Sequence, residues 1–198
     1  MVYTLDGTAP TPKSAVYRSA IALPRGGTVM AACVAPDGRL GMAASKYFAG
    51  LAPTGWKIVS VDSEEASSPA SNAIDGDPAT IWQTRQHADL ALPHQIRVDL
   101  ASPRRIAGFT YLPRRDGSRE GIVESYRFET SVDGHNWTTD VDSGHFGNMQ
   151  NNPELQEVSF APVNARFFRF TALHGLDSGS STSAAEISVL PAEGEGDR

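Results

Sequence analysis

Short apolar runs recur along the whole chain, and clusters of turn residues separate them. From residue 56 onward these runs are rich in Val, Ile, Phe and Tyr, which favours strands over helices. The predicted strands are 57–61, 95–100, 106–112, 125–131, 156–160, 166–172 and 186–190. Asp133-Gly134 is a typical hairpin turn, and no window of twelve or more residues holds a convincing helical period. The pattern therefore predicts an all-β sandwich or jelly roll.

The first fifty residues have shorter runs and more small residues. They predict strands at 2–5, 16–17, 20–23, 28–35 and 45–48. The segment Gly-Leu-Ala-Pro-Thr-Gly at 50–55 has the composition of a linker. We therefore expect a small β domain at 1–50, a linker at 51–55, a larger β domain at 56–191 and a disordered tail at 192–198. Because the first domain starts abruptly in a strand, we expect it to be truncated at its N-terminus.

The net charge and the length of the apolar stretches argue against several classes of function, and the single cysteine is expected to be structural. The 198 residues carry a formal net charge of -6, which argues against nonspecific binding to nucleic acid or to an anionic membrane. No apolar stretch approaches the roughly 20 residues of a membrane span, and the N-terminus lacks a secretory signal. Cys33 is the single cysteine and lies in the apolar run 29–34, so we expect a buried, inert thiol.

The segment from Asn72 to Trp82 combines carboxylates, an amide, a hydroxyl and a turn glycine. Oxygen ligands of this kind suit a hard cation such as calcium, and Gly76 permits the sharp bend that aims successive carbonyls inward. The same residues are equally typical of an ordinary surface turn. The residues alone leave both interpretations open.

Seven motifs in order resemble a discoidin domain, also called a coagulation factor V/VIII type C domain. They are Asn72 to Trp82, Leu-Pro-His at 92–94, Val-Asp-Leu at 98–100, 111–117, 131–137, 165–170 and 184–187. The resemblance is strongest to the bacterial carbohydrate-binding branch, carbohydrate-binding module family 32. Residues 2–48 resemble the small immunoglobulin-like C-terminal domain of chitobiases and β-hexosaminidases. The resemblance implies a small immunoglobulin-like β-sandwich followed by a discoidin-type β-sandwich.

The resemblance implies one structural calcium ion that joins the 72–82 loop to the last strand. Its ligands would be the carboxylates of Asp75 and Glu186, the hydroxyl and carbonyl of Thr80, and the carbonyls of Asn72, Asp77 and Ala185. Two carboxylates neutralise a divalent cation, and oxygens from a flexible backbone suit calcium better than magnesium. Zinc is disfavoured because the histidines lack ligand spacing.

The resemblance also implies a site for a galactose-type sugar. Arg114 and Asp116 match the family's Leu-Pro-Arg-x-[Asn/Asp]-Gly segment, whereas the family's histidine is replaced by Gln83, whose amide can donate and accept. The 174–183 loop has no aromatic residue to stack on the sugar. Either His174 or Leu176 substitutes for that ring, or the affinity is weak, or sugar binding is lost. Alternatively, Arg114 and Asp116 form only a salt bridge at a strand end.

Catalytic machinery is not visible in this sequence. A nucleophile elbow, a phosphate loop and a dinucleotide fingerprint are all missing. The leading hypothesis is a non-catalytic carbohydrate-binding region of a secreted or periplasmic bacterial glycoside hydrolase, with terminal galactose-type glycans as partners. An α-L-fucosidase is the first choice of parent and a β-hexosaminidase the second. The alternative is a structural sandwich that braces the catalytic domain of the parent chain.

Overall fold

The computed structural model describes residues 1–19, 21, 23, 27–48, 55–85, 91–177 and 179–192. The chain divides into two compact units, Met1–Ala52 and Pro53–Arg198, each of which is described by itself. Most of the expected linker at 51–55 and residues 193–198 of the expected tail lie outside the described residues, so both remain predictions. Ala192, expected in that tail, is buried, and its N–H donates to the Arg105 carbonyl at 3.0 Å.

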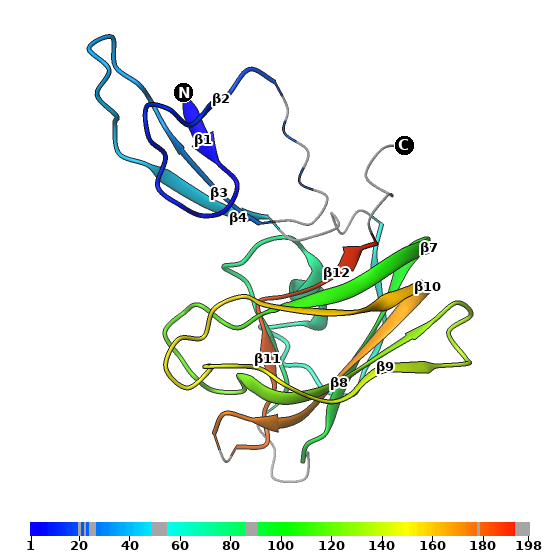
Figure 1. Cartoon of the computed structure of the whole chain (residues 1–198). Helices are drawn as coiled ribbons and strands as arrows, with labels where there is room; N and C mark the ends of the chain where they lie inside the picture. The colour runs from blue at the N-terminus through cyan, green and yellow to red at the C-terminus, as the bar shows by residue number, and fades with distance from the viewer. Residues whose placement is uncertain are drawn as a thin grey trace. The chain divides into compact units, whose positions relative to one another are not determined.

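The first unit contains one antiparallel sheet with the order β2-β1-β3-β4 among its described residues (Figure 1). Its strands are β1 (Val2–Thr4), β2 (Ala15–Val16), β3 (Gly27–Ala32) and β4 (Ala44–Phe48). Among the described residues of this unit Val2, Pro10 and Ala32 are buried, and Val2 and Ala32 are cross-strand partners. Four of the expected strands are therefore present, and the one expected at 20–23 lies largely outside the described residues.

The prediction for Cys33 is wrong, because its thiol is exposed. Strand β3 ends one residue earlier, at Ala32. The chain then enters a turn in which the Cys33 carbonyl accepts from Gly41 N and Ala35 N donates to the Arg39 carbonyl. The apolar run continues past the end of the strand, so apolar character alone does not mark burial here.

The second unit is built on one long antiparallel sheet with the order β12-β7-β10-β8-β9, with β5 also paired to β7. The strands are β5 (Lys57–Val61), β7 (His94–Leu112), β8 (Val123–Ser131), β9 (Thr138–His145), β10 (Gln156–Gly175) and β12 (Glu186–Pro191). Strands β7 and β10 each join two expected strands into one. The first part of β7 pairs with β5 and its last part with β12, so the sheet bends around a core as a β-sandwich.

Four elements of the second unit were not predicted. They are the 3-10 helix η1 (Ala70–Ile74), strand β6 (Trp82–Gln83), strand β11 (Ser183–Ala184) and strand β9. Strands β6 and β11 pair with each other and are only two residues long, which is too short for a periodic pattern. Strand β9 is mostly exposed at the sheet edge, and its sequence therefore lacks alternating apolar residues.

Aromatic rings fill the core of the second unit. Phe109 is fully buried and stacks on Phe128 with ring centroids 4.1 Å apart. Tyr126, Phe146 and Phe170 surround the same ring. Among the described residues, no helix is long and apolar enough to cross a membrane.

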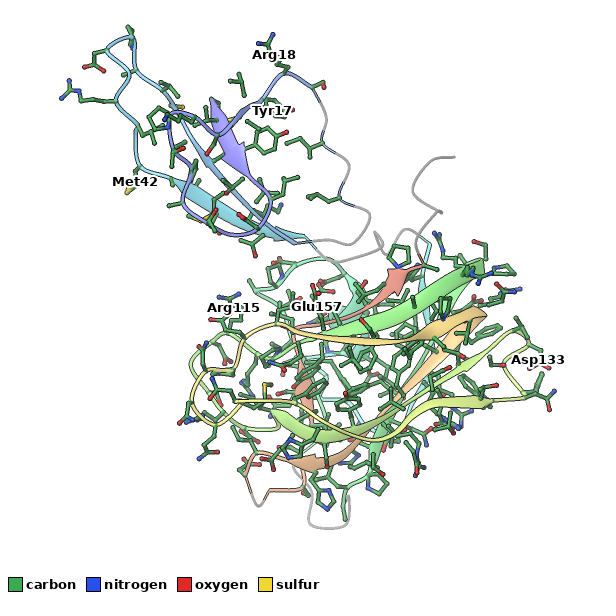
Figure 2. All side chains as sticks on the ribbon, in the orientation of Figure 1. Tyr17, Arg18, Met42, Arg115, Asp133 and Glu157 are labelled. Carbon is green, nitrogen blue, oxygen red and sulfur yellow. The ribbon has the colours of Figure 1, made fainter. Side chains whose placement is uncertain are left out.

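The two ends of the sandwich carry different polar groups. Figure 2 shows Arg115 at one end of the second unit and Asp133 at the other. Arg115 belongs to the segment that follows β7, and Asp133 to the turn between β8 and β9. One end holds the Arg114 cluster and the other the Arg97 pocket, both described below.

Candidate functional site

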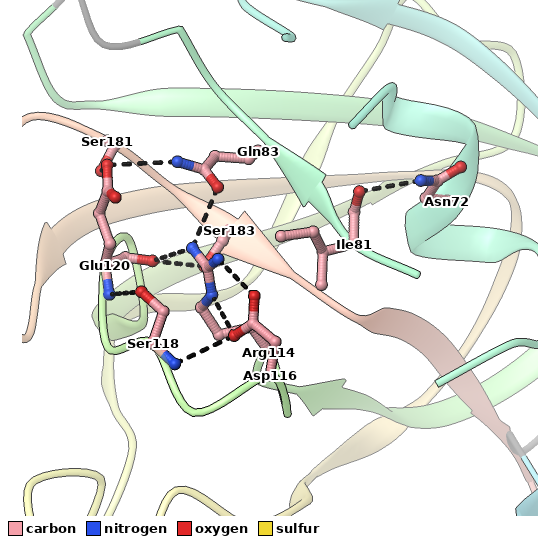
Figure 3. Close-up of polar contacts among 9 residues, drawn as sticks. All are labelled: Asn72, Ile81, Gln83, Arg114, Asp116, Ser118, Glu120, Ser181 and Ser183. Atoms are coloured by element: carbon pink, nitrogen blue, oxygen red, sulfur yellow. Dashed lines mark hydrogen bonds and ion pairs between the residues drawn. The ribbon is translucent and has the colours of Figure 1, made fainter. Parts of the chain in front are cut away.

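Arg114 is the centre of a polar cluster at the end of β7 (Figure 3). Its Nε donates to Asp116 Oδ1 at 2.8 Å and its Nη2 to Asp116 Oδ2 at 2.6 Å. Its Nη1 donates to Gln83 Oε1 and to the Glu120 carbonyl, both at 3.0 Å. The structure therefore brings Gln83, Arg114 and Asp116 together.

The guanidinium of Arg114 is largely occupied by the protein itself. The four hydrogen bonds leave one of its five N–H groups for another partner, and the side chain is only 8% exposed. The Asp116 carboxylate is 48% exposed. Hydrogen bonds from Arg114 lower its pKa to about 2. The salt bridge considered from the sequence is thus present, and the accessible acceptor of the pair is Asp116.

Glu120 completes the cluster and was not predicted from the sequence. Its Oε1 accepts from Gln83 Nε2 at 3.2 Å and from Ser181 Oγ at 3.4 Å. Gly121 allows this approach, because a Cβ there would lie 2.8 Å from the Ser183 nitrogen. Gln83 and Glu120 therefore present an amide and a carboxylate side by side. The chain around Glu120 shows no motif that could have identified it.

The histidine proposed as a substitute for the aromatic platform lies elsewhere. His174 is exposed, and its Nδ1 lies 2.9 Å from Ser125 Oγ at the pairing of β8 and β10. Leu176, the other candidate, is half-buried, and its backbone N–H donates to the Ile122 carbonyl. The hydrogen bonds of the Arg114 cluster involve neither residue.

His94 holds the loop that carries Ser181. Its side chain is 1% exposed, with Nδ1 2.8 Å from Asp62 Oδ2 and Nε2 2.8 Å from the Ser180 carbonyl. The Asp62 carboxylate and the Ser180 carbonyl both accept hydrogen bonds, and the imidazolium form of His94, in which both ring nitrogens donate, satisfies both contacts. The hydrogen bond with Asp62 is the main cause of a raised His94 pKa, against the opposing effect of burial.

This raised pKa predicts a pH-dependent stability. A folded-state pKa above the unfolded value of 6.5 gives a contribution that is fully present below pH 6.5. The contribution is lost as pH rises through the folded-state pKa. We expect the free energy of unfolding of wild type relative to His94→Gln to decrease from pH 6 to pH 9, measured by urea denaturation. A difference that stays flat or increases over this window would contradict the prediction.

The helix η1, which leads into the 72–82 loop, contacts both β12 and β6. Asp75 Oδ1 accepts from Asp77 N at 2.8 Å, and Asp75 Oδ2 accepts from Thr80 Oγ1 at 2.8 Å. Asn72 Nδ2 donates to the Ile81 carbonyl at 3.0 Å. Gly76 has a φ of 78°, as the bend requires. These bonds fold the loop tightly around its own carboxylates.

Glu186 is a buried carboxylate next to Asp75. It is 1% exposed, and its Oε1 has no hydrogen-bond partner. Burial first, and then the charge of Asp75, raise the pKa of Glu186 to about 8. Ala185, also expected as a ligand, is fully buried beside it. Two neighbouring carboxylates, one with an unpartnered oxygen, match the donor chemistry of a cation site.

The described residues contain no group of three or more His, Cys, Asp and Glu side chains that could hold a metal ion. A cation between Asp75 and Glu186 would therefore need hydroxyl and backbone carbonyl ligands as well. Thr80 and the carbonyls of the loop are oxygens of that kind.

Comparison with known proteins finds a family match in each unit. Residues 57–187 match the F5/8 type C domain family. The chain belongs to the F5/8 type C domain family. Residues 1–48 match the family described as Fn3 associated. The F5/8 type C domain is 34% identical over 137 residues to a sialidase of Micromonospora viridifaciens, and 31% identical over 136 residues to a galactose oxidase of Gibberella zeae.

These matches cover 67% and 68% of this chain but only 21% and 20% of the two relatives. The chain thus spans about a fifth of the length of the curated relatives. A Clostridium perfringens family 32 module in complex with GalNAc-β-1,3-galactose superposes with a TM-score of 0.63 and 30% identity, covering 71% of this chain and 98% of that one. The family 32 module of C. perfringens NanJ in complex with galactose gives 0.61 and 28%, covering 70% and 96%.

Proposed function

We propose that the F5/8 type C domain is a non-catalytic carbohydrate-binding module for terminal galactose-type sugars, with its site at Gln83, Arg114, Asp116 and Glu120. The observation that carries the proposal is the convergence of these four polar side chains at one end of the sandwich. Solved relatives at about 30% identity are complexes with galactose and with a GalNAc-galactose disaccharide. Such a module raises the local concentration of substrate for an attached enzyme without adding chemistry.

Asp116 and Glu120 would accept hydrogen bonds from sugar hydroxyls, and the amide of Gln83 would donate one. The role of Arg114 is mainly to fix these acceptors, because only one of its N–H groups remains. A polar site without a stacking ring competes directly with water. We expect dissociation constants in the high micromolar to millimolar range, or about 4 to 6 kcal/mol.

The sugar site is tested by titrating the protein with galactose, N-acetylgalactosamine, fucose and lactose while following the NMR signals of Gln83 and Trp82. Arg114→Ala should abolish binding, and Asp116→Asn should weaken it about tenfold through loss of a charged acceptor. Arg115→Ala is the matched control, because it removes the adjacent exposed cation and should leave affinity unchanged.

Arg114→Ala also removes four internal hydrogen bonds, so its melting temperature must be compared with that of wild type. The Asp116→Asn variant keeps the test valid if Arg114→Ala is unstable, because Asp116 is half-exposed. If none of the four sugars shifts the Gln83 or Trp82 signals at tens of millimolar, the proposal fails, and a bracing role for the sandwich replaces it.

A structural calcium ion between the 72–82 loop and β12 belongs to the same proposal. Asp75 and Glu186 would supply the charges, Thr80 a hydroxyl and a carbonyl, and Asn72, Asp77 and Ala185 carbonyls. The unpartnered Glu186 oxygen supports it, since an ion would supply the missing partner of a buried charge. Bound there, calcium would hold the first and last parts of the unit together.

The parent of these two units is proposed to be a secreted or periplasmic glycoside hydrolase. An α-L-fucosidase is the first choice and a β-hexosaminidase the second. The match of the F5/8 type C domain to 21% of the length of a sialidase supports an accessory region of a larger enzyme. Sequencing the complete reading frame tests this directly.

A further inference from the structure

A second pocket lies at the opposite end of the sandwich from Arg114. Its volume is about 230 Å³, and it is lined by Val59, Arg97, Asp133, Gly134, His135, Trp137 and Phe167. These residues come from β5, β7, β10 and the turn between β8 and β9. Figure 2 shows Asp133 at this end, far from Arg115. The pocket shares no residue with the sugar site proposed above.

Local irregularities of the strands shape this pocket. The register of β5 against β7 shifts between Ile58 and Ser60, which leaves Val59 as an extra, exposed residue at a bulge. Bulges of this kind re-aim a side chain. A similar shift between Ala165 and Phe167 occurs in β10. The Phe167 ring packs within 3.6 Å of the position a Cβ on Gly134 would occupy, so the turn lies directly against β10.

Arg97 is an arginine of this sheet face that has no carboxylate partner among the described residues. Three other arginines each pair with a carboxylate: Arg166 with Asp99, Arg169 with Glu129 and Arg127 with Asp142. By contrast, Arg97 makes one long hydrogen bond of 3.4 Å from Nε to Gln95 Oε1. Its terminal N–H groups have no hydrogen bond or ion pair with any residue that the structure describes.

Trp137 holds this guanidinium in place. Arg97 and Arg169 are direct cross-strand partners, and their Cζ atoms lie 5.7 and 4.7 Å from the centroid of the Trp137 ring. Glu129 compensates the charge of Arg169 alone. The positive charge of Arg97 therefore remains available, on a side chain that the indole restrains.

Asp133 is the only carboxylate in the lining, and it stabilises the turn. Its Oδ1 accepts from the backbone N–H groups of His135 and Asn136, both at 2.8 Å, and its Oδ2 accepts from Asn136 Nδ2 at 2.7 Å. These bonds lower the pKa of Asp133. Asp133 therefore stays ionised, its oxygens are occupied by donors within the turn, and no ion pair joins it to Arg97 among the described residues.

We propose that this pocket is a second saccharide site, which binds a pyranose carrying a carboxylate. The carboxylate would accept two parallel hydrogen bonds from the terminal N–H groups of Arg97. The apolar face of the sugar ring would lie against Trp137, Phe167 and Val59. The volume is below the roughly 300 to 1,000 Å³ of sites for drug-sized ligands, which suits one sugar ring better than a peptide. The choice of a sugar rests on the proposed function of the domain.

Two separate NMR signals allow the two sites to be observed independently. The side-chain amide of Gln83, which contacts Arg114 and Glu120, reports on the first site. The indole of Trp137, which is half-buried and lines the pocket, reports on the second. In a spectrum of indole N–H groups, galacturonate should shift the Trp137 signal, while galactose and acetate at equal concentration should not. Galactose differs from galacturonate only at C6, and acetate supplies the carboxylate without the ring.

Arg97→Gln should weaken the Trp137 response to galacturonate about tenfold or more. Arg127→Gln removes the same charge from the same sheet face away from the pocket and should leave the response unchanged. Arg114→Ala should also leave it unchanged, and Arg97→Gln should not alter the response of the Gln83 side-chain amide to galactose. Failure of the first site therefore shows at Gln83, and failure of the second at Trp137.

The proposal is overturned if galacturonate leaves the Trp137 signal unshifted in wild type. It is overturned equally if galactose or acetate shifts that signal as much, or if Arg97→Gln responds as wild type does. Because Arg97 is half-buried on the outside of the sheet, its variant should melt at the temperature of wild type, and a melt of each variant verifies this.

Discussion

Phe109→Ala should destabilise the second unit by about 3 to 5 kcal/mol, the range for deleting a buried phenylalanine ring. The expected effect is at the upper end because Phe109 is fully buried and contacts four other aromatic rings. A loss of this size is a large part of the stability of an ordinary domain. Urea denaturation followed by tryptophan fluorescence measures it.

Phe160→Ala is the matched control for this variant. Its ring is half-buried and lies 5.8 Å from that of Phe128 at the margin of the same cluster. The same truncation there should cost clearly less. Equal losses for the two variants would show that the buried cluster does not dominate the stability of the unit.

Removal of calcium should lower the melting temperature of the second unit by several degrees. A ligand of the native state contributes RT ln(1 + [L]/Kd), which is about 2.7 kcal/mol at a hundredfold excess over Kd. Calorimetry in calcium and in chelator measures the difference. The expectation follows from the proximity of Asp75 and Glu186, two carboxylates from distant parts of the chain. Without an ion between them, ionising both carboxylates is costly, as the raised pKa of Glu186 shows.

The Glu186→Gln variant distinguishes stabilisation by calcium from the stability of the fold without the ion. The variant should lose the calcium-dependent gain, and in chelator it should be at least as stable as wild type, because the cost of burying a carboxyl group beside Asp75 is gone. Glu154→Gln, which removes an exposed carboxylate, should keep the full calcium response. An unchanged wild-type melt in chelator, together with metal analysis that finds no bound ion, would contradict the calcium proposal.

The strands of the second unit could be predicted wherever one face is buried. The alternation in β7 and β8 follows directly from that burial. The joining of two expected strands into β7 could not be predicted, because Ala101, with a φ of 69°, adopts a conformation that is uncommon for alanine. The turn-like residues 101–105 resemble an interruption, yet the hydrogen-bonded ladder continues on both sides.

The candidate site was accessible from the sequence only through family motifs. Resemblance located Gln83, Arg114 and Asp116, but it also suggested His174, whose contact is with Ser125. Glu120 and Arg97 went unnoticed because single charged residues have no pattern. What distinguishes them is the set of neighbours that the fold supplies, and that information is three-dimensional.

The central position of β7 determines which strand pairs would bear a pulling force on the second unit. The first strand of the second unit, β5, and the last, β12, both pair with β7, through Lys57↔Asp99 and Pro191↔Ile106. Tension applied through the two ends of this unit would therefore load the hydrogen bonds that β7 makes with β5 and β12. Strands β8 and β9, whose turn carries Trp137, lie beyond β10 and outside that load path. A module that the rest of its chain anchors to a surface could thus keep a glycan bound under tension while β8 and β9 still bear no load.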